Sequence, residues 1–200
     1  MASILVVCTG NVCRSPIAEG MLRVALEARL GDGAPLVASA GTAGWEGSAA
    51  MPESVVAAAE RGVDISGHVA RRLQAEHVLA ADLVIAMAAE HRVWVVRTVP
   101  EAAGRAFTLK ELVRLVEALP PEGAAGPAAD RLPGQVRAAD ELRRSGFAGN
   151  PHDEDVVDPL GLPVESYRAI AWELAEWCGR AADGIAGSVQ ATRTAGSAEA

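Results

Sequence analysis

Short apolar runs alternate with longer amphipathic stretches along most of the chain. Four runs have the length and composition of buried strands, at residues 4–8, 36–40, 83–87 and 106–108. Apolar residues recur with helical spacing in the stretches between and after them, at about 17–30, 53–61, 89–99, 109–119 and 167–182. Strands that alternate with helices favour an α/β fold with a mostly parallel sheet.

Two segments lack this pattern. Residues 118–152 are rich in proline, glycine and charge and form an unusually long connection, so we interpret them as a surface insertion. A short helix is expected within it, at 134–144. Residues 187–200 are small and polar, which is typical of a disordered tail. The sequence therefore predicts one domain, 1–186, followed by this tail.

Composition and charge narrow the class of protein. Half of the 200 residues are hydrophobic, which is sufficient for the core of one domain. The net charge of −8 argues against a nucleic-acid partner, because binding the phosphate backbone requires a basic face. Three cysteines are too few for a secreted disulfide scaffold, and neither a signal peptide nor a membrane span is indicated. We therefore expect a cytoplasmic protein without a membrane partner.

The most informative chemistry directly follows the first predicted strand. Residues 8–16 read Cys-Thr-Gly-Asn-Val-Cys-Arg-Ser-Pro and lead into the first predicted helix. Such a loop directs backbone N–H groups and the positive end of a helix at one small volume. A helix N-terminus and a nearby cation favour the thiolate form of a cysteine, so Cys8 is a candidate nucleophile. Arg14 offers a fork of donors matched to two phosphate oxygens, and Ser15 can donate a hydrogen bond to the sulfur.

The residues between the thiol and the guanidinium complete a predicted phosphate-binding loop: Thr9, Gly10, Asn11, Val12 and Cys13. Gly10 allows a turn where a side chain would clash. The amide of Asn11 can tie the loop backbone to a neighbouring turn. The sequence thus predicts a loop that binds an oxyanion such as phosphate and attacks it.

Two other interpretations of this loop are weaker. Cys8 and Cys13 would be two zinc ligands, but a second cysteine pair or a close histidine pair is missing from the sequence. We therefore expect no metal and no cofactor. A buried structural thiol is the ordinary interpretation of a cysteine that ends an apolar strand. That interpretation leaves Arg14 and Ser15 at a helix start unexplained.

The loop resembles the active-site signature of the low-molecular-weight protein tyrosine phosphatase family, whose relatives include protein arginine phosphatases and some arsenate reductases. Further segments match family landmarks in the family's order: 39–42, 62–64, His68, 81–87, 107–109 and Asp158-Pro159. The resemblance implies an α/β fold, a single doubly wound domain with a four-stranded parallel sheet flanked by helices. It also implies a cysteine-dependent phosphoprotein phosphatase that forms a cysteinyl-phosphate intermediate, with a phosphorylated protein as its partner.

Asp158 is the predicted general acid and base. Dephosphorylation needs an acid to protonate the departing atom and then a base to activate water, and one carboxyl group can serve both steps. An aspartate before a proline is by itself an ordinary turn. Its place before the last predicted helix matches the family's acid. We interpret the neighbouring residues 153–155 as solvated loop charges.

The resemblance assigns supporting roles to residues outside the loop. Ser39 matches the family serine that hydrogen-bonds the loop asparagine, here Asn11. His68 matches a structural histidine, and Trp45 falls where many members carry an aromatic wall beside the substrate. A rim for an acidic phosphopeptide is one interpretation of Arg71 and Arg72, and a solvated face is the favoured one.

Cys13 has a second expected role. It lies five residues from Cys8 on one tight loop, so the two thiols could form a reversible disulfide when Cys8 is oxidised. The resemblance implies that this disulfide is protective. A small packing residue is the simpler interpretation, and the two are compatible.

Two positions favour different substrates. The tyrosine-specific branch usually has isoleucine in the place of Val12 and the arginine-specific branch has threonine, so a residue without a hydroxyl favours phosphotyrosine. Leu160 is a second candidate for the substrate wall. Tyrosine-specific members often carry an aromatic residue in its place, so the leucine makes this position more similar to the arginine branch. We predict phosphotyrosine hydrolysis, with protein arginine phosphatase as the alternative.

Two further classes share the scaffold. Thioredoxin-coupled arsenate reduction needs two more cysteines after the third strand, and residues 83–105 contain none. Arsenate reduction with an external thiol stays open. A non-catalytic phosphoprotein-binding module would be expected to lose Cys8 or Asp158, and both are present.

Overall fold

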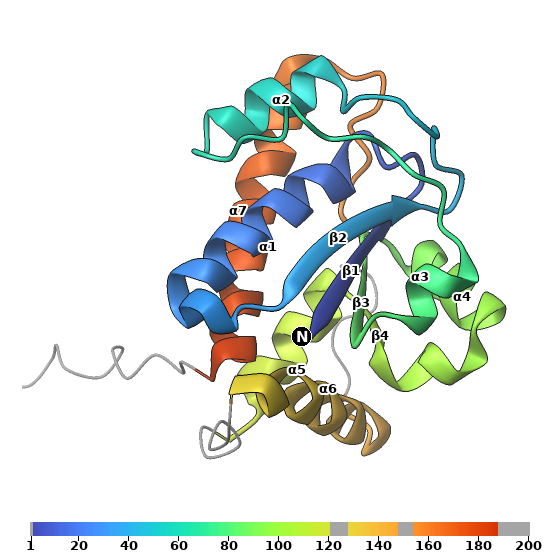
Figure 1. The fold of residues 1–200 in the computed structure, drawn as a ribbon, viewed down its shortest axis with the longest axis vertical. Helices are drawn as coiled ribbons and strands as arrows, with labels where there is room; N and C mark the ends of the chain where they lie inside the picture. Colours follow the sequence, from blue (N-terminus) through green and yellow to red (C-terminus); the bar gives the residue numbers. More distant parts are fainter. Residues whose placement is uncertain (1, 121–127, 148–153, 188–200) are drawn as a thin grey trace, which may run out of the picture.

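A computed structural model describes the chain over residues 2–120, 128–147 and 154–187. Its centre is a four-stranded parallel sheet with the strand order β2-β1-β3-β4 (Figure 1). The strands are β1 (Ser3–Cys8), β2 (Leu36–Gly41), β3 (Leu83–Ala86) and β4 (Ala106–Thr108). Each strand agrees with a predicted one to within one residue at either end.

Helices cover both faces of this sheet (Figure 1). The larger group comprises α1 (Arg14–Leu30), α2 (Pro52–Ala59), α5 (Leu109–Ala118), α6 (Ala128–Arg144) and α7 (Val164–Ala186). The opposite face carries α3 (Ala75–Leu79), α4 (Ala89–Thr98) and the 3-10 helix η2 (Pro100–Arg105). A second 3-10 helix, η1 (Gly31–Gly33), precedes β2. The predicted doubly wound α/β fold with a four-stranded parallel sheet is confirmed.

The central strand β1 explains the two layers. Ile4, Val6 and Cys8 belong to the larger hydrophobic core, whereas Leu5 and Val7 belong to the smaller one. Successive side chains of a strand point to opposite faces, so a continuous apolar run requires cover on both sides. The apolar sequence of β1 is therefore the physical reason why helices pack on both faces.

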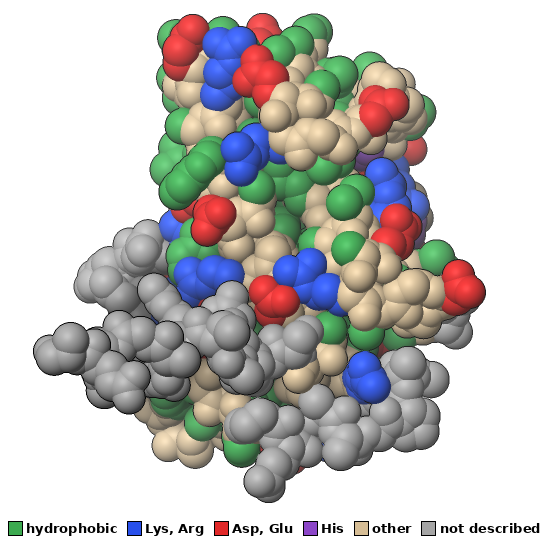
Figure 2. Space-filling view, turned by 90° about the vertical axis from the view of Figure 1, so that its left-hand side faces the viewer, with side chains coloured by type: hydrophobic (Ala, Val, Ile, Leu, Met, Phe, Trp, Pro, Cys, Tyr) green, Lys and Arg blue, Asp and Glu red, His purple; other side chains and the backbone are tan. Residues whose placement is uncertain are grey.

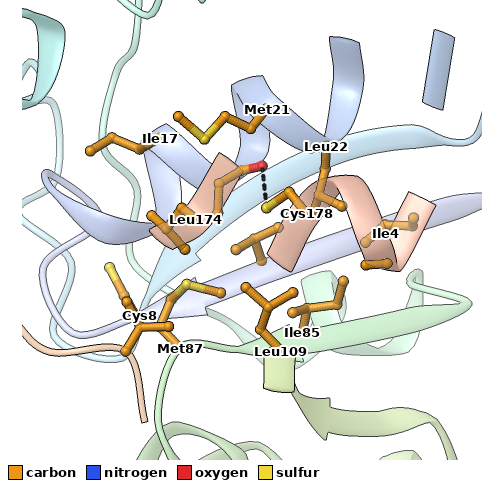
Figure 3. Packing of buried hydrophobic residues seen from close by; sticks show 14 of the residues in the cluster. Ile4, Cys8, Ile17, Met21, Leu22, Ile85, Met87, Leu109, Leu174 and Cys178 are labelled. Carbon is orange, nitrogen blue, oxygen red and sulfur yellow. Dashed lines mark hydrogen bonds between the residues drawn. The ribbon is translucent and has the colours of Figure 1, made fainter. Parts of the chain in front are cut away.

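The larger core lies between the sheet, α1 and α7 (Figure 3). Cys178 of α7 is fully buried there, and its thiol donates to the Ala18 carbonyl of α1 over 3.9 Å. Burial raises the pKa of the Cys178 thiol. Cys178 is therefore a packing residue. Cys8 lies elsewhere, beside Met87 at the carboxyl ends of β1 and β3 (Figure 3).

Helix α6 differs from what the sequence predicted. Leu132, Val136 and Ala139 are buried in the larger core, where α6 contacts α5 and α7. Their spacing places them on one side of a helix that already begins at Ala128. The prediction of a surface insertion over 118–152 is therefore wrong for this helix. Its apolar stripe is difficult to recognise in the sequence because prolines and glycines flank it.

Other differences are smaller. Helix α3 was not predicted, because its five residues are too few to show a helical period. Helix α1 begins at Arg14, three residues before the predicted start, and this shift brings Arg14 and Ser15 into the first turn. The predicted disordered tail, apart from Gly187, lies outside the described residues.

Helix α7 is tied to its neighbours at the surface by ion pairs. They join it to α1, to the end of α2 and to α5: Arg29–Asp183, Arg168–Glu60 and Arg180–Glu117. Figure 2 shows acidic and basic side chains interspersed over the face it displays. Within the described ranges, every helix is too short or too polar to cross a membrane.

Candidate active site

The loop of residues 8–16 joins the carboxyl end of β1 to α1 and forms one side of a pocket. This is the position expected for a ligand site in an open parallel sheet, because β1 lies where the strand order reverses. The pocket is lined by Cys8, Thr9, Gly10, Val12, Cys13, Arg14, Ala43, Trp45, Asp158 and Leu160. All of these except Ala43 were named from the sequence.

The segment that follows β2 holds the loop from the outside. Its backbone N–H groups donate to loop carbonyls at 2.8–3.0 Å: Thr42 to Cys8, Ala43 to Thr9, Trp45 to Gly10 and Met51 to Val12. With these carbonyls engaged outside, the Asn11 N–H points inward and donates to Cys8 Sγ at 3.2 Å. A Cβ atom on Gly41 would lie 2.4 Å from the Thr9 carbonyl oxygen, so this approach requires glycine.

Asn11 holds the sharpest turn of the loop. Its φ of 57° is left-handed, a conformation that costs free energy for a residue other than glycine. Its side-chain amide donates to Ser39 Oγ at 2.8 Å and Ser15 Oγ at 2.9 Å, and its Oδ1 accepts from the Arg71 N–H at 2.9 Å. His68 Nε2 donates to the Asn11 carbonyl at 2.8 Å. Four partners thus stabilise the strained residue.

Beneath the loop, Glu19, Ser39, Asn11 and Ser15 form a continuous chain of hydrogen bonds. Ser39 Oγ donates to Glu19 Oε2 at 2.6 Å and accepts from Asn11. Ser15 Oγ also accepts from Asn11, and it lies 2.9 Å from Cys8 Sγ, to which its own proton can be donated.

Arg14 joins the loop to the segment that carries Asp158. Its NH2 donates to Asp158 Oδ2 at 2.6 Å and to Thr9 Oγ1 at 3.3 Å, and its NH1 donates to the Val156 carbonyl at 3.0 Å. Among the residues that the structure describes, Arg14 Nε has no hydrogen-bond partner. The Arg14 side chain is 5% exposed and that of Asp158 is 40% exposed. The carboxylate therefore lies at the pocket mouth and the guanidinium deeper inside.

Two acidic residues anchor the Asp158 segment. Asp155 Oδ1 accepts the Ala89 N–H at the start of α4 at 2.7 Å, and Glu154 Oε2 accepts the Thr108 hydroxyl at the end of β4 at 2.8 Å. The interpretation as a solvated loop charge is therefore wrong for Glu154, whose side chain is 17% exposed, whereas Asp155 is exposed as expected but has a role that was not predicted. Their sequence carries no signal of this role, because both partners are distant in the chain.

The pocket mouth has an aromatic side and an aliphatic side. Trp45 is 47% exposed and Leu160 is 42% exposed, and both line the pocket that contains Cys8. A Cβ atom on Gly10 would lie 3.7 Å from Trp45 Nε1, so the indole lies against the loop. Val12 also lines this pocket and is 2% exposed. Within the described ranges, no cluster of three or more ligands suits a metal ion.

Residues 3–119 match the model of a protein family described as low molecular weight phosphotyrosine protein phosphatase. The chain belongs to this family. The matched segment contains the whole loop and ends before Asp158, whose place in the pocket comes from the structure.

Relatives of this phosphatase family differ in their named substrates. The chain is 43% identical over 103 residues to the low molecular weight protein-tyrosine-phosphatase Etp of Escherichia coli K12, covering 52% of this chain and just under two thirds (66%) of that protein. It is 33% identical over 171 residues to a protein-arginine-phosphatase of Geobacillus stearothermophilus, covering 86% and 87%. The crystal structure of a low molecular weight protein tyrosine phosphatase from T. tengcongensis superposes with a TM-score of 0.66 at 34% identity, covering 90% and 97%.

Cys13 is a buried thiol in this family member. Burial raises its pKa to about 11, and its Sγ donates to the Tyr167 hydroxyl over 3.9 Å. Burial likewise raises the pKa of Tyr167 to about 12. Cys13 is therefore a protonated thiol at neutral pH, and its disulfide with Cys8 stays a prediction.

Of three further residues around the loop, Glu19 and His91 were not identified from the sequence, and Arg71 was given the wrong role. Glu19 accepts from Ser39, and Arg71 Nε donates to the Ser39 carbonyl at 2.7 Å, so the interpretation of Arg71 as part of a solvated face is wrong. His91 Nε2 lies 2.9 Å from Thr9 Oγ1 in a buried position. The sequence does offer one indication for His91. It lies in the first helical turn after β3, and such a turn is adjacent to the carboxyl edge of the sheet, where the candidate site lies.

His91 makes stability depend on pH. Burial, and then the charge of Arg14, lower its pKa from 6.5 to about 4, against the opposite effect of Asp155 and Asp158. The unfolded chain therefore binds more protons between these values, so this contribution to stability is complete above pH 6.5 and is lost as pH falls towards 4. We expect the free energy of unfolding to fall by about 2 kcal/mol from this group between about pH 7.5 and 5.

Urea unfolding at several pH values measures this effect. His91→Gln is expected to remove the corresponding part of the pH dependence, because glutamine does not titrate. Identical slopes for the wild type and His91→Gln would show that His91 contributes nothing to it.

Proposed function

We propose that this phosphatase-family protein hydrolyses phosphotyrosine in a phosphorylated protein substrate, through a cysteinyl-phosphate intermediate on Cys8. One observation carries the proposal: the Cys8 thiol, the Arg14 guanidinium and the Asp158 carboxylate line a single pocket. This combination supplies a nucleophile, an oxyanion clamp and an acid–base group.

In the first step, Cys8 Sγ attacks phosphorus, so that an S–P bond forms as the P–O bond to the phenol breaks. Arg14 holds the phosphoryl oxygens through donors that include Nε, which has no partner among the described residues. These oxygens compete with Asp158 for the guanidinium and release its carboxyl group for proton transfer. Asp158, which carries a proton taken from solvent or from the water of the preceding turnover, then gives that proton to the departing phenolate oxygen.

In the second step, the Asp158 carboxylate takes a proton from water as that water attacks phosphorus. The S–P bond breaks, inorganic phosphate leaves, and Cys8 returns as a thiolate. The Ser15 hydroxyl, which lies 2.9 Å from the sulfur, supports this leaving thiolate. The same carboxyl group thus serves both steps, because each step regenerates the form that the other requires.

The pocket mouth supports an aromatic substrate. Trp45 offers an indole against which a phenyl ring can pack, with Leu160 also lining the pocket. Val12 has no hydroxyl that could hydrogen-bond a phosphoguanidinium or its attacking water. Phosphotyrosine therefore fits the described walls best.

Protein arginine phosphatase is the second candidate, and Leu160 favours it. Because Leu160 is aliphatic, a phenol ring in this pocket would contact one aromatic side chain, Trp45, and would lack a second aromatic contact at position 160. The Geobacillus relative, which is named a protein-arginine-phosphatase, aligns with most of this chain. The two substrates share the attack chemistry and differ only in what contacts the departing group.

The proposed compartment is the cytoplasm. All three cysteines are free thiols, and the proposed nucleophile needs a reducing environment to stay reduced.

A comparison of substrates on wild type and Val12→Thr tests the choice of substrate. The wild type is expected to release phosphate faster from phosphotyrosine peptides than from phosphoarginine peptides. Val12→Thr is expected to raise the phosphoarginine-to-phosphotyrosine ratio of kcat/KM by about tenfold, the effect of one added hydrogen bond in the pocket. Arsenate with an external thiol is the third substrate in the assay.

Val24→Thr is the matched control, because Val24 is an exposed valine of α1. It is expected to leave the ratio unchanged. If Val12→Thr also left the ratio unchanged, selectivity would not reside at position 12. If the wild type preferred phosphoarginine or arsenate, that compound would replace phosphotyrosine as the proposed substrate.

A further inference from the structure

His91 connects the first turn of α4 to the phosphate-binding loop. Its side chain is almost completely buried, and Nε2 lies 2.9 Å from Thr9 Oγ1. Thr9 lines the pocket, and its Oγ1 also accepts from Arg14 NH2 at 3.3 Å. One hydroxyl therefore joins a buried imidazole to the guanidinium that holds phosphate.

The surroundings assign the imidazole proton to Nε2. Glu90 Oε1 lies 3.5 Å from Nε2, whereas Nδ1 is buried and has no hydrogen-bond partner among the described residues. A buried acceptor without a partner costs less free energy than a buried N–H without one. With Nε2–H as donor, both acceptor sites of Thr9 Oγ1 are occupied, by His91 and by Arg14. The Thr9 hydroxyl proton is then free to point into the pocket.

We propose that His91 is a positioning residue of the reaction, acting through Thr9. By holding Thr9 Oγ1, it fixes the acceptor that orients Arg14 and directs the Thr9 hydroxyl at the phosphoryl group. This inference rests on the proposed phosphatase function. Because the pKa of His91 is lowered to about 4, the imidazole is neutral and the arrangement persists throughout the neutral range.

The position of the donor atom gives a sharp test. Glutamine places its amide nitrogen near the place of Nε2, whereas asparagine reaches only as far as Nδ1. With p-nitrophenyl phosphate, His91→Asn is expected to lower kcat about tenfold while KM changes less than about threefold. His91→Gln is expected to stay within about threefold of the wild-type kcat. A general packing defect would affect both variants alike.

A double-mutant cycle tests whether Thr9 carries the effect. Thr9→Val keeps the shape of the side chain and removes the hydroxyl. On the Thr9→Val background, His91→Asn is expected to change kcat by less than about twofold, because the contact that it removes is already absent. The affinity for inorganic phosphate, measured by calorimetry, is expected to follow the same pattern. Thermal melts establish that each variant is folded.

Three results would overturn the inference. They are equal activity of His91→Asn and His91→Gln, an undiminished effect of His91→Asn on the Thr9→Val background, and a loss that follows the melting temperature. His77→Gln is the control for a histidine-to-glutamine change outside the pocket. A wild type that does not hydrolyse aryl phosphates would instead contradict the proposed function, and phosphate affinity would still report on His91.

Discussion

Replacing Cys8 by serine is expected to abolish phosphate release, with kcat at least about a thousandfold lower. The serine hydroxyl would occupy the place of the thiol, beside the Asn11 N–H and the Ser15 hydroxyl. A hydroxyl is not ionised at neutral pH and is a poor nucleophile without an adjacent base. The measurement is release of inorganic phosphate from a phosphotyrosine peptide.

Two comparisons separate attack from binding. Cys178→Ala changes a buried thiol of the larger core and is expected to keep kcat near that of the wild type. Cys8→Ser is expected to retain phosphate binding, because the loop and Arg14 remain. Arg14→Ala is expected to lose both binding and turnover. Full activity of Cys8→Ser would contradict the proposed mechanism.

Removing the proposed general acid, Asp158, is expected to have the second largest effect on turnover. In the wild type, Asp158 Oδ2 accepts from Arg14 and Oδ1 accepts from the Leu160 N–H. Asp158→Asn keeps the size of the side chain and one of these two acceptor oxygens. It cannot transfer a proton. We expect kcat for phosphotyrosine to fall about a hundredfold to ten-thousandfold, the usual contribution of general acid–base catalysis.

The size of this effect depends on the leaving group. A p-nitrophenolate leaves without needing a proton, so Asp158→Asn is expected to slow p-nitrophenyl phosphate less than phosphotyrosine in single-turnover measurements. Asp32→Asn provides the matched control, because Asp32 is exposed in η1, which precedes β2 at the amino edge of the sheet. Equal losses for both substrates would mean that Asp158 does not protonate the departing oxygen.

Local sequence was sufficient for the strands and for the chemistry of the loop. The run from Ile4 to Cys8 is apolar at every position, which is diagnostic for a strand that is buried on both faces. The thiol, the turn and the guanidinium follow within seven residues. Their geometry is therefore controlled by one strand end and one helix start.

The misses have a common physical cause. Helix α6 was misjudged because its three buried positions gain their meaning only from the surfaces of α5 and α7. Glu154 and Asp155 look like any acidic loop residues until β4 and α4 supply the donors. Burial of a polar side chain depends on partners that a one-dimensional pattern does not contain.

The sequence by itself determined the alternation of strands and helices and the loop with its candidate nucleophile and candidate oxyanion clamp, because those features depend on neighbours in the chain. Tertiary structure alone decided that Asp158 lies 2.6 Å from a guanidinium 144 residues away. It also decided that His91 reaches Thr9 across 82 residues. Parallel strands bring their carboxyl ends to one edge, so residues that are distant in the sequence meet there.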